Sequence, residues 1–130
     1  MQIKLVSITV DDQEKAHRFY TAILGFETSA DVPMGPHRWL TVSSPDGVHG
    51  VELVLESLGF EPARVYQQSL FDAGVRATAF ISQNIHAAYA RLKSPGVVFR
   101  GEPKNLGPVT TCMFEDTRGN LINFAQPGGD

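Results

Sequence analysis

Hydrophobic and polar residues follow one another in short segments with regular spacing, and this spacing predicts the secondary structure. Residues 2–10 alternate between apolar and mixed positions, which is typical of a strand with one dry face and one mixed face. The dry face carries Val6, Ile8 and Val10. The mixed face carries Leu5, Ser7 and Thr9.

A helical pattern follows this strand. Asp11 and Asp12 offer side chains for a helix N-cap, and apolar residues then recur at intervals of three and four. These apolar residues are Ala16, Phe19, Tyr20, Ile23 and Leu24. Gly25 is predicted to end the helix, because glycine readily adopts the left-handed conformation that follows a helix.

Three further strands are predicted before residue 58. Residues 26–30 form a short strand and residues 31–36 a loop. Residues 38–42 and 51–55 form two more strands, joined through a turn at 44–47 that is rich in Ser, Pro, Asp and Gly. The order of elements is therefore βαβββ.

The same plan appears a second time along the chain. Met34-Gly35-Pro36 aligns with Leu106-Gly107-Pro108, and Pro45-Asp46-Gly47 with Thr117-Arg118-Gly119, both at a shift of 72 residues (106 − 34 and 119 − 47). A helix is expected after Asn84, on the stripe Ile85, Ala88, Tyr89 and Leu92. The strands expected in this copy are 77–81, 97–100, 109–114 and 121–124.

The repeat predicts the fold class. We expect an α+β protein in which two tandem βαβββ units form curled mixed sheets around a concave cavity. Residues 1–130 would form a single domain, with repeat unit one at about 1–57, a connection at about 58–74 and repeat unit two at about 75–126. The connection is expected to hold a short helix, since Pro62 suits a first helical position and Gly74 a helix end.

Composition excludes several classes of partner. Eleven basic and fourteen acidic residues, without long runs of one sign, give no electrostatic footprint for nucleic acid. Cys112 is the only cysteine, which excludes an intrachain disulfide and fits a reducing compartment. No apolar run reaches the length of a membrane span, and no secretory leader is evident. These observations predict a cytoplasmic protein that has neither nucleic acid nor a membrane as a partner.

The mixed strand faces predict a small-molecule site. One helix in each unit covers one face of its sheet, so the other face remains available to line a concave and mostly apolar space. The side chains with the parity to line it in the first unit are Leu5, Ser7, Thr9, Trp39, Thr41, Glu52 and Val54. Those in the second unit are Ala77, Ala79, Thr111, Met113, Asn123 and Ala125.

Two motifs carry a resemblance to a known family. The opening motif runs from Val10-Asp11-Asp12-Gln13-Glu14-Lys15-Ala16 through Phe19-Tyr20 to Leu24-Gly25-Phe26. The closing motif is Phe114-Glu115-Asp116-Thr117-Arg118-Gly119-Asn120-Leu121-Ile122. Together with the paired βαβββ plan, they resemble the glyoxalase, bleomycin-resistance and extradiol-dioxygenase superfamily, whose members are also called vicinal oxygen chelate proteins. The resemblance covers nearly the whole chain and also implies a homodimer.

Metal-using members of that superfamily hold a divalent ion with two histidines and two acids. The resemblance places these four positions at Leu5, Glu52, Ala77 and Asn123. Only Glu52 is a strong ligand, whereas a catalytic zinc usually has three protein ligands. The sequence therefore predicts no metal and no other cofactor.

Single residues leave alternatives open. His37 has the parity to face the pocket, and Trp39 is either a flat wall for an aromatic ligand or a core or subunit contact. Glu52 is a paired acid, a group that addresses the substrate, or a vestigial metal ligand. Cys112 shares strand parity with Phe114, which favours an inert core cysteine.

Three functions follow from these residues. The first is a metal-free protein that binds a hydrophobic or aromatic small molecule. The second is an enzyme, namely a metal-dependent lyase, isomerase or dioxygenase, or a metal-free one with Glu52 as catalytic general base. The third is an interaction module without a ligand. The predicted ligand-binding residues are Leu5, Ser7, His37, Trp39, Thr41, Glu52, Ala77, Thr111, Met113 and Asn123.

Overall fold

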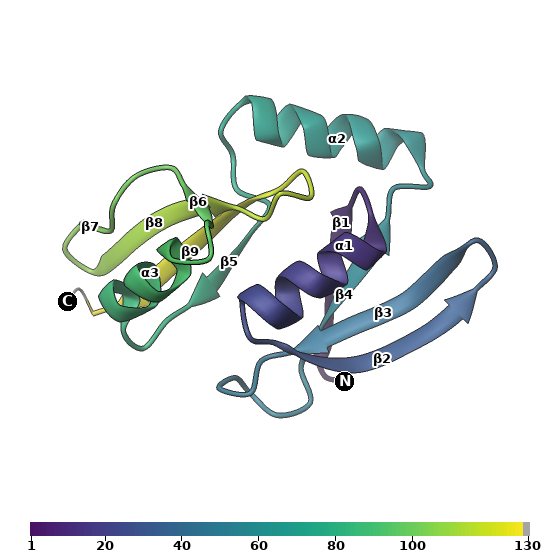
Figure 1. Ribbon diagram of the computed structural model, residues 1–130, viewed down its shortest axis with the longest axis horizontal. Helices are drawn as coiled ribbons and strands as arrows, with labels where there is room; N and C mark the ends of the chain where they lie inside the picture. Colours follow the sequence, from purple (N-terminus) through teal and green to yellow (C-terminus); the bar gives the residue numbers. More distant parts are fainter. Residues whose placement is uncertain (129–130) are drawn as a thin grey trace. The chain divides into compact units, whose positions relative to one another are not determined.

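The computed structural model describes residues 1–128 and consists of two compact units, Met1–Val65 and the chain from Tyr66 onward. The first unit holds four strands in the order β1-β4-β3-β2 (Figure 1). Their bounds are Leu5–Val10 for β1, Glu27–Met34 for β2, His37–Ser43 for β3 and Glu52–Ser57 for β4. β1 and β4 run parallel and the other pairs are antiparallel, so the sheet is mixed.

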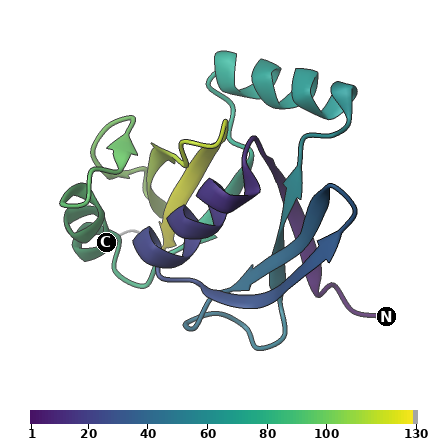
Figure 2. The same ribbon diagram turned by 45° about the vertical axis from the view of Figure 1, so that its right-hand side comes forward.

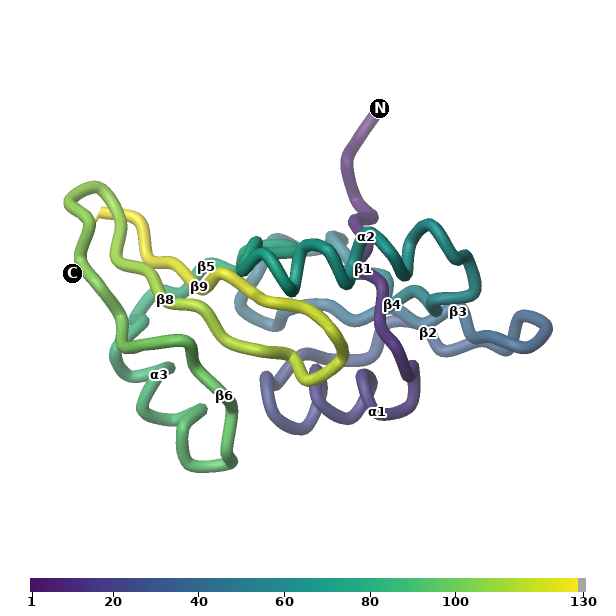
Figure 3. Tube along the Cα trace, turned by 90° about the horizontal axis from the view of Figure 1, so that it is seen from above, coloured from purple at the N-terminus to yellow at the C-terminus, as the bar shows by residue number. Residues whose placement is uncertain are grey.

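One helix covers the dry face of this sheet. α1, Gln13–Arg18, begins at Asp12, whose carboxylate accepts a hydrogen bond from the backbone N–H of Lys15. Figure 3 shows the helix on one side of strands β2, β3 and β4. The residues buried on this side are Ile8, Val10, Ala16, Tyr20, Leu40, Val42, Leu53 and Leu55. Val6 shares their parity but stays half exposed.

The helix changes its pitch after Arg18. Phe19–Ile23 form a π-helical turn, η1, in place of the uninterrupted α-helix that the apolar spacing predicts. The Thr21 hydroxyl donates 2.6 Å to the His17 carbonyl, a local bond of the kind that bends helices. Gly25 has φ +84° and ends the segment as predicted.

Residues 31–36 are mostly a strand, so the predicted loop is wrong. β2 continues to Met34 and pairs with β3 as a long curved hairpin, visible in Figure 2. Asp31 and Pro33 are poor strand formers, but the partner strand compensates for them, whereas Gly35 lies in the turn after β2. Val32 lies opposite Trp39, and the Asp31 carboxylate contacts Arg38 across the ladder.

The second unit repeats the topology of the first and adds one short strand, β7, which pairs with β8. Its sheet has the order β5-β9-β8-β6, with β5 parallel to β9, and α3 packs on one face (Figure 3). The strands are β5 Thr78–Ile81, β6 Val98–Phe99, β7 Lys104–Asn105, β8 Val109–Glu115 and β9 Leu121–Pro127. α3 spans Ile85–Lys93, and Asn84 caps it as predicted. The α+β class with two tandem βαβββ units is therefore confirmed.

The helix α2, Glu61–Asp72, is longer than the short helix predicted for the connection. Its Gln67 is buried and donates to the Arg118 carbonyl at 3.3 Å and to Asn120 Oδ1 at 3.2 Å. It thereby contacts the turn between β8 and β9. Within that turn, Asp116 is fully buried and accepts hydrogen bonds from the backbone N–H groups of Arg118 and Asn120. Across residues 1–128, no helix is long and apolar enough to cross a bilayer.

Candidate functional site

The strand register of the first unit places the predicted mixed side chains on one face. Thr41 lies opposite Val54, and Leu5 and Ser7 lie beside Glu52 and Val54 in the parallel pair. Residues that face each other across a ladder point to the same side of a sheet. The mixed face is therefore continuous over β1, β4 and β3.

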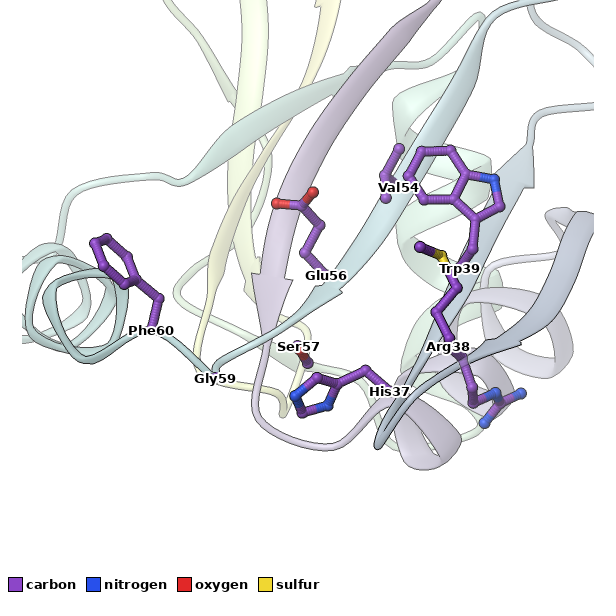
Figure 4. Close-up of a pocket in the computed structure, with 9 residues that line it drawn as sticks. His37, Arg38, Trp39, Val54, Glu56, Ser57, Gly59 and Phe60 are labelled. Atoms are coloured by element: carbon purple, nitrogen blue, oxygen red, sulfur yellow. The ribbon is translucent and has the colours of Figure 1, made fainter.

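A pocket of about 440 Å³ opens at one end of this face, within the size range of small-molecule sites. Its apolar walls are Trp39, Val54, Phe60 and Met34, and Figure 4 shows Trp39 and Phe60 on opposite sides of Glu56. The remaining lining residues are His37, Arg38, Ser57 and Gly59. The pocket lies entirely within the first unit.

His37 packs against the backbone at Gly59. A Cβ atom placed on Gly59 would lie 3.0 Å from His37 Nε2, closer than such contacts normally come. Because Gly59 has no side chain, the imidazole ring of His37 can pack directly against the backbone in the lining of the pocket. Gly59 and Phe60 come from the segment between β4 and α2, which completes the site next to the sheet.

Arg38 lines the pocket, but its guanidinium group points away from it (Figure 4). The group donates to both carboxylate oxygens of Asp31, at 2.9 and 2.8 Å, and to Glu14 at 2.8 Å. The bidentate hydrogen bond to Asp31 is the main cause that raises the pKa of Arg38, and the same bond lowers the pKa of Asp31. The positive charge of Arg38 is consequently already paired with the carboxylates of Asp31 and Glu14.

A second contact fixes the ends of the strands that hold the pocket. The Gln13 amide donates to the carbonyls of Arg38 and Leu55, each at 2.8 Å, and its Oε1 accepts from the Arg38 backbone N–H at 3.0 Å. One side chain from the first turn of α1 therefore satisfies three backbone groups of β3 and β4. This arrangement orients the neighbouring His37 and Trp39.

Glu52 and Asn123 make equivalent hydrogen bonds in the two units. Thr41 Oγ1 donates to Glu52 Oε1 at 2.6 Å, and Thr111 Oγ1 donates to Asn123 Oδ1 at 2.5 Å. Thr41 lies 70 residues before Thr111 (111 − 41) and Glu52 lies 71 before Asn123 (123 − 52), close to the 72-residue shift. In each unit a threonine hydroxyl therefore donates to a side-chain oxygen, which belongs to a carboxylate in the first unit and to an amide in the second.

The residues at the four metal positions that the resemblance implies do not suit a divalent ion. Leu5 and Ala77 have no donor atom, and Asn123 offers only an amide oxygen that already accepts from Thr111. In the part of the chain that the structure describes, no three His, Cys, Asp or Glu side chains gather as a metal site.

The structure brings only some of the predicted site residues together. His37 and Trp39 line the pocket, whereas Leu5, Ser7, Thr41 and Glu52 lie on the same sheet face outside its lining. Thr111, Met113 and Asn123 share one face of the second sheet, and Ala77 precedes β5. Their part in ligand binding stays a prediction.

Sequence reasoning missed Glu56 and Phe60. Glu56 follows Glu52 and Val54 at the strand period of two, but the predicted strand ended at residue 55, whereas β4 runs to Ser57. Phe60 stands in an irregular segment, where no periodic pattern gives its direction. Cys112 is buried, and this burial raises its pKa to about 11, as expected of a cysteine that does not react.

Comparison with known proteins places the chain in a family. The family model of the Glyoxalase/Bleomycin resistance protein/Dioxygenase superfamily matches residues 2–124. The uncharacterized protein YurT of Bacillus subtilis (strain 168) is 47% identical over 126 residues, which cover 97% of this chain and 99% of YurT.

Solved structures agree with this match. The crystal structure of UcmS2 is 32% identical with a TM-score of 0.83, covering 96% of this chain and 97% of that one. TnmS3, an antibiotic binding protein from Streptomyces sp. CB03234, is 32% identical with a TM-score of 0.78, covering 98% of this chain and 97% of that one. By its sequence and its fold, the chain belongs to the Glyoxalase/Bleomycin resistance protein/Dioxygenase superfamily.

Proposed function

We propose that the protein binds a hydrophobic or aromatic small molecule without the help of a metal ion, in the cytoplasm. The observation that carries this proposal is the pocket between Trp39 and Phe60. A planar ligand would contact the face of the indole ring, because aromatic rings supply large flat surfaces at low entropic cost. Phe60 is 67% exposed and Met34 57%, so burying them against a ligand would remove apolar surface from water.

Two relatives support a binding role. TnmS3 is an antibiotic binding protein, and a second neighbour from the same Streptomyces strain is a glyoxalase/bleomycin resistance protein, 32% identical with a TM-score of 0.72. Both share the fold of this chain over nearly its full length. A comparable binding function here requires only the pocket and no reacting group.

The metal-free character of the site rests on its side-chain chemistry. Purified protein is expected to hold no stoichiometric divalent metal, since Leu5 and Ala77 stand where imidazole ligands are needed. Elemental analysis after gentle purification measures this. One equivalent of zinc, nickel, manganese or iron that is lost in the Glu52→Ala variant would contradict the proposal and favour a lyase, isomerase or dioxygenase.

An enzyme with Glu52 as general base is the second candidate. The hydrogen bond from Thr41 fixes one carboxylate oxygen of Glu52 on the open sheet face and leaves the other oxygen outside that bond. A base needs such a positioned oxygen within reach of the proton that it removes. Turnover of a bound compound that stops in Glu52→Gln would favour this reading over binding alone.

Titration of Trp39 fluorescence tests the binding proposal. Trp39 is the only tryptophan, so a planar hydrophobic ligand that stacks on it is expected to change the emission in a saturable way. A panel of aromatic and quinone-like compounds at fixed protein concentration provides the probes, and equilibrium dialysis gives the dissociation constants independently.

We also propose that the protein is a homodimer. Light scattering at micromolar concentration would detect the dimer as twice the chain mass. If Trp39 belonged to a subunit contact instead, its emission would follow dilution and not ligand. No response to any compound, together with emission that depends on protein concentration, would contradict the binding proposal.

A further inference from the structure

We propose that the pocket selects planar aromatic ligands that carry a positive charge, such as a protonated amine or a cationic ring. This inference rests on the proposed binding function and adds the charge of the ligand to it. The inference is based on the ionisable side chains in the pocket lining. These are Glu56, Arg38 and His37, and they differ in whether they already form ion pairs with other side chains.

The only arginine of the lining is not available to an anion. Its guanidinium group already contacts Asp31 and Glu14 and is directed away from the pocket (Figure 4). An anionic ligand would have to compete with two carboxylates that hold Arg38 at 2.8 Å each. The site therefore offers no free guanidinium group to a carboxylate or a phosphate.

Glu56 differs from Arg38 in its ion pairing. It lines the pocket, is exposed, and forms no ion pair with any lysine or arginine among residues 1–128. Figure 4 shows its carboxylate between Trp39 and Phe60. A ligand held against either ring would bring its own polar group close to this carboxylate.

Trp39 favours the same charge. The face of an indole ring attracts cations, and tryptophan is the strongest of the aromatic side chains in this respect. The carboxylate of Glu56 and the indole face of Trp39 therefore both attract a flat cation, and both disfavour a flat anion. His37 when neutral can accept a hydrogen bond from an ammonium group without opposing its charge.

Three linear tricyclic probes separate the charge from the ring system. Proflavine is a cation, phenazine is neutral and phenazine carboxylate is an anion. Equilibrium dialysis with the full chain is expected to give a dissociation constant for proflavine about three- to tenfold lower than for phenazine, because each exposed attraction is modest. Phenazine carboxylate is expected to bind most weakly, and raising the salt should narrow the differences.

Two matched variants assign this preference to the pocket. Glu56→Gln removes the charge with little change of shape, so proflavine should lose its advantage while phenazine binds within about twofold of the wild-type protein. Glu27→Gln makes the same change of net charge on an exposed acid outside the pocket, at the start of β2. It should keep the advantage of proflavine. Unchanged phenazine binding also shows that each variant is folded.

The outcomes distinguish the two proposals. If phenazine binds as tightly as proflavine to the wild-type protein, the charge selection is wrong and the binding function stands. If Glu27→Gln lowers proflavine binding as much as Glu56→Gln does, overall charge and not the pocket is responsible, and the inference also fails. If none of the three probes binds, both the binding function and the charge selection are rejected for planar aromatics.

Discussion

Gly119→Ala is expected to lower the free energy of unfolding by about 3 kcal/mol, through strain of about 1–2 kcal/mol and disturbed hydrogen bonds of similar size. Gly119 has φ +96°, in the region where a side chain is strained. A Cβ atom there would also lie 2.6 Å from Gln67 Oε1 and 2.8 Å from its Cδ. The buried Gln67 would have to leave its bonds to Arg118 and Asn120. Thermal unfolding should show a melting temperature lower by roughly 10 °C.

Gly96→Ala is the matched control for this prediction. Gly96 has nearly the same φ, +92°, but apart from its chain neighbours no heavy atom lies within 4 Å of the position of its Cβ. It should therefore show the backbone strain alone, about 1–2 kcal/mol. In a Gln67→Ala background, the cost of Gly119→Ala should fall to the same level. Equal effects of Gly119→Ala with and without Gln67 would show that the contact does not matter.

Trp39→Ala is expected to weaken the binding of a planar aromatic probe by about ten- to a hundredfold. The expectation follows from the value of stacking on an aromatic side chain, roughly 1–3 kcal/mol, and from the conversion of about 1.4 kcal/mol per factor of ten. Equilibrium dialysis is the suitable measurement, because the variant has lost its only fluorescent tryptophan. Phenazine is the suitable probe, since it carries no charge and its binding is expected not to depend on the charge of Glu56.

Trp39→Phe tests whether a flat aromatic side chain at this position is sufficient for binding. Phenylalanine keeps an aromatic wall in β3, so this variant should retain most of the affinity, within a factor of about three to five. Thermal unfolding of both variants shows whether the half-buried position tolerates the change. If Trp39→Ala is stable and binds phenazine as well as the wild-type protein, the ligand does not lie on the indole ring.

The repeated pattern was sufficient to predict the architecture. A shift of 72 residues between two turn motifs required the same order of elements twice, and both sheets have the same topology, with the first strand paired in parallel to the last. Strand parity then placed Leu5, Ser7, Trp39, Thr41 and Glu52 on one face. Period-two spacing is reliable here because one face of the sheet must be buried under a helix.

The parts that were missed depend on partners far away in the sequence. Residues 31–36 contain Asp, Pro and Gly, and only the pairing with β3 makes most of them a strand. The pocket lining was only partly predicted for the same reason. His37 and Trp39 follow from parity on β3, but Phe60 and Gly59 enter from the segment before α2, whose path no local pattern describes.

The matched hydrogen bonds of Thr41 and Thr111 have a consequence for the polarity of the two sheets. In each bond the threonine hydrogen is already used, so neither hydroxyl remains as a donor for a ligand. The carboxylate oxygens of Glu52 accept hydrogen bonds, whereas the Asn123 amide keeps its N–H₂ group as a donor. The two positions related by the repeat therefore differ in polarity, since the Glu52 carboxylate only accepts hydrogen bonds whereas Asn123 can also donate them. A ligand fragment that pairs well with one copy would be mismatched to the other.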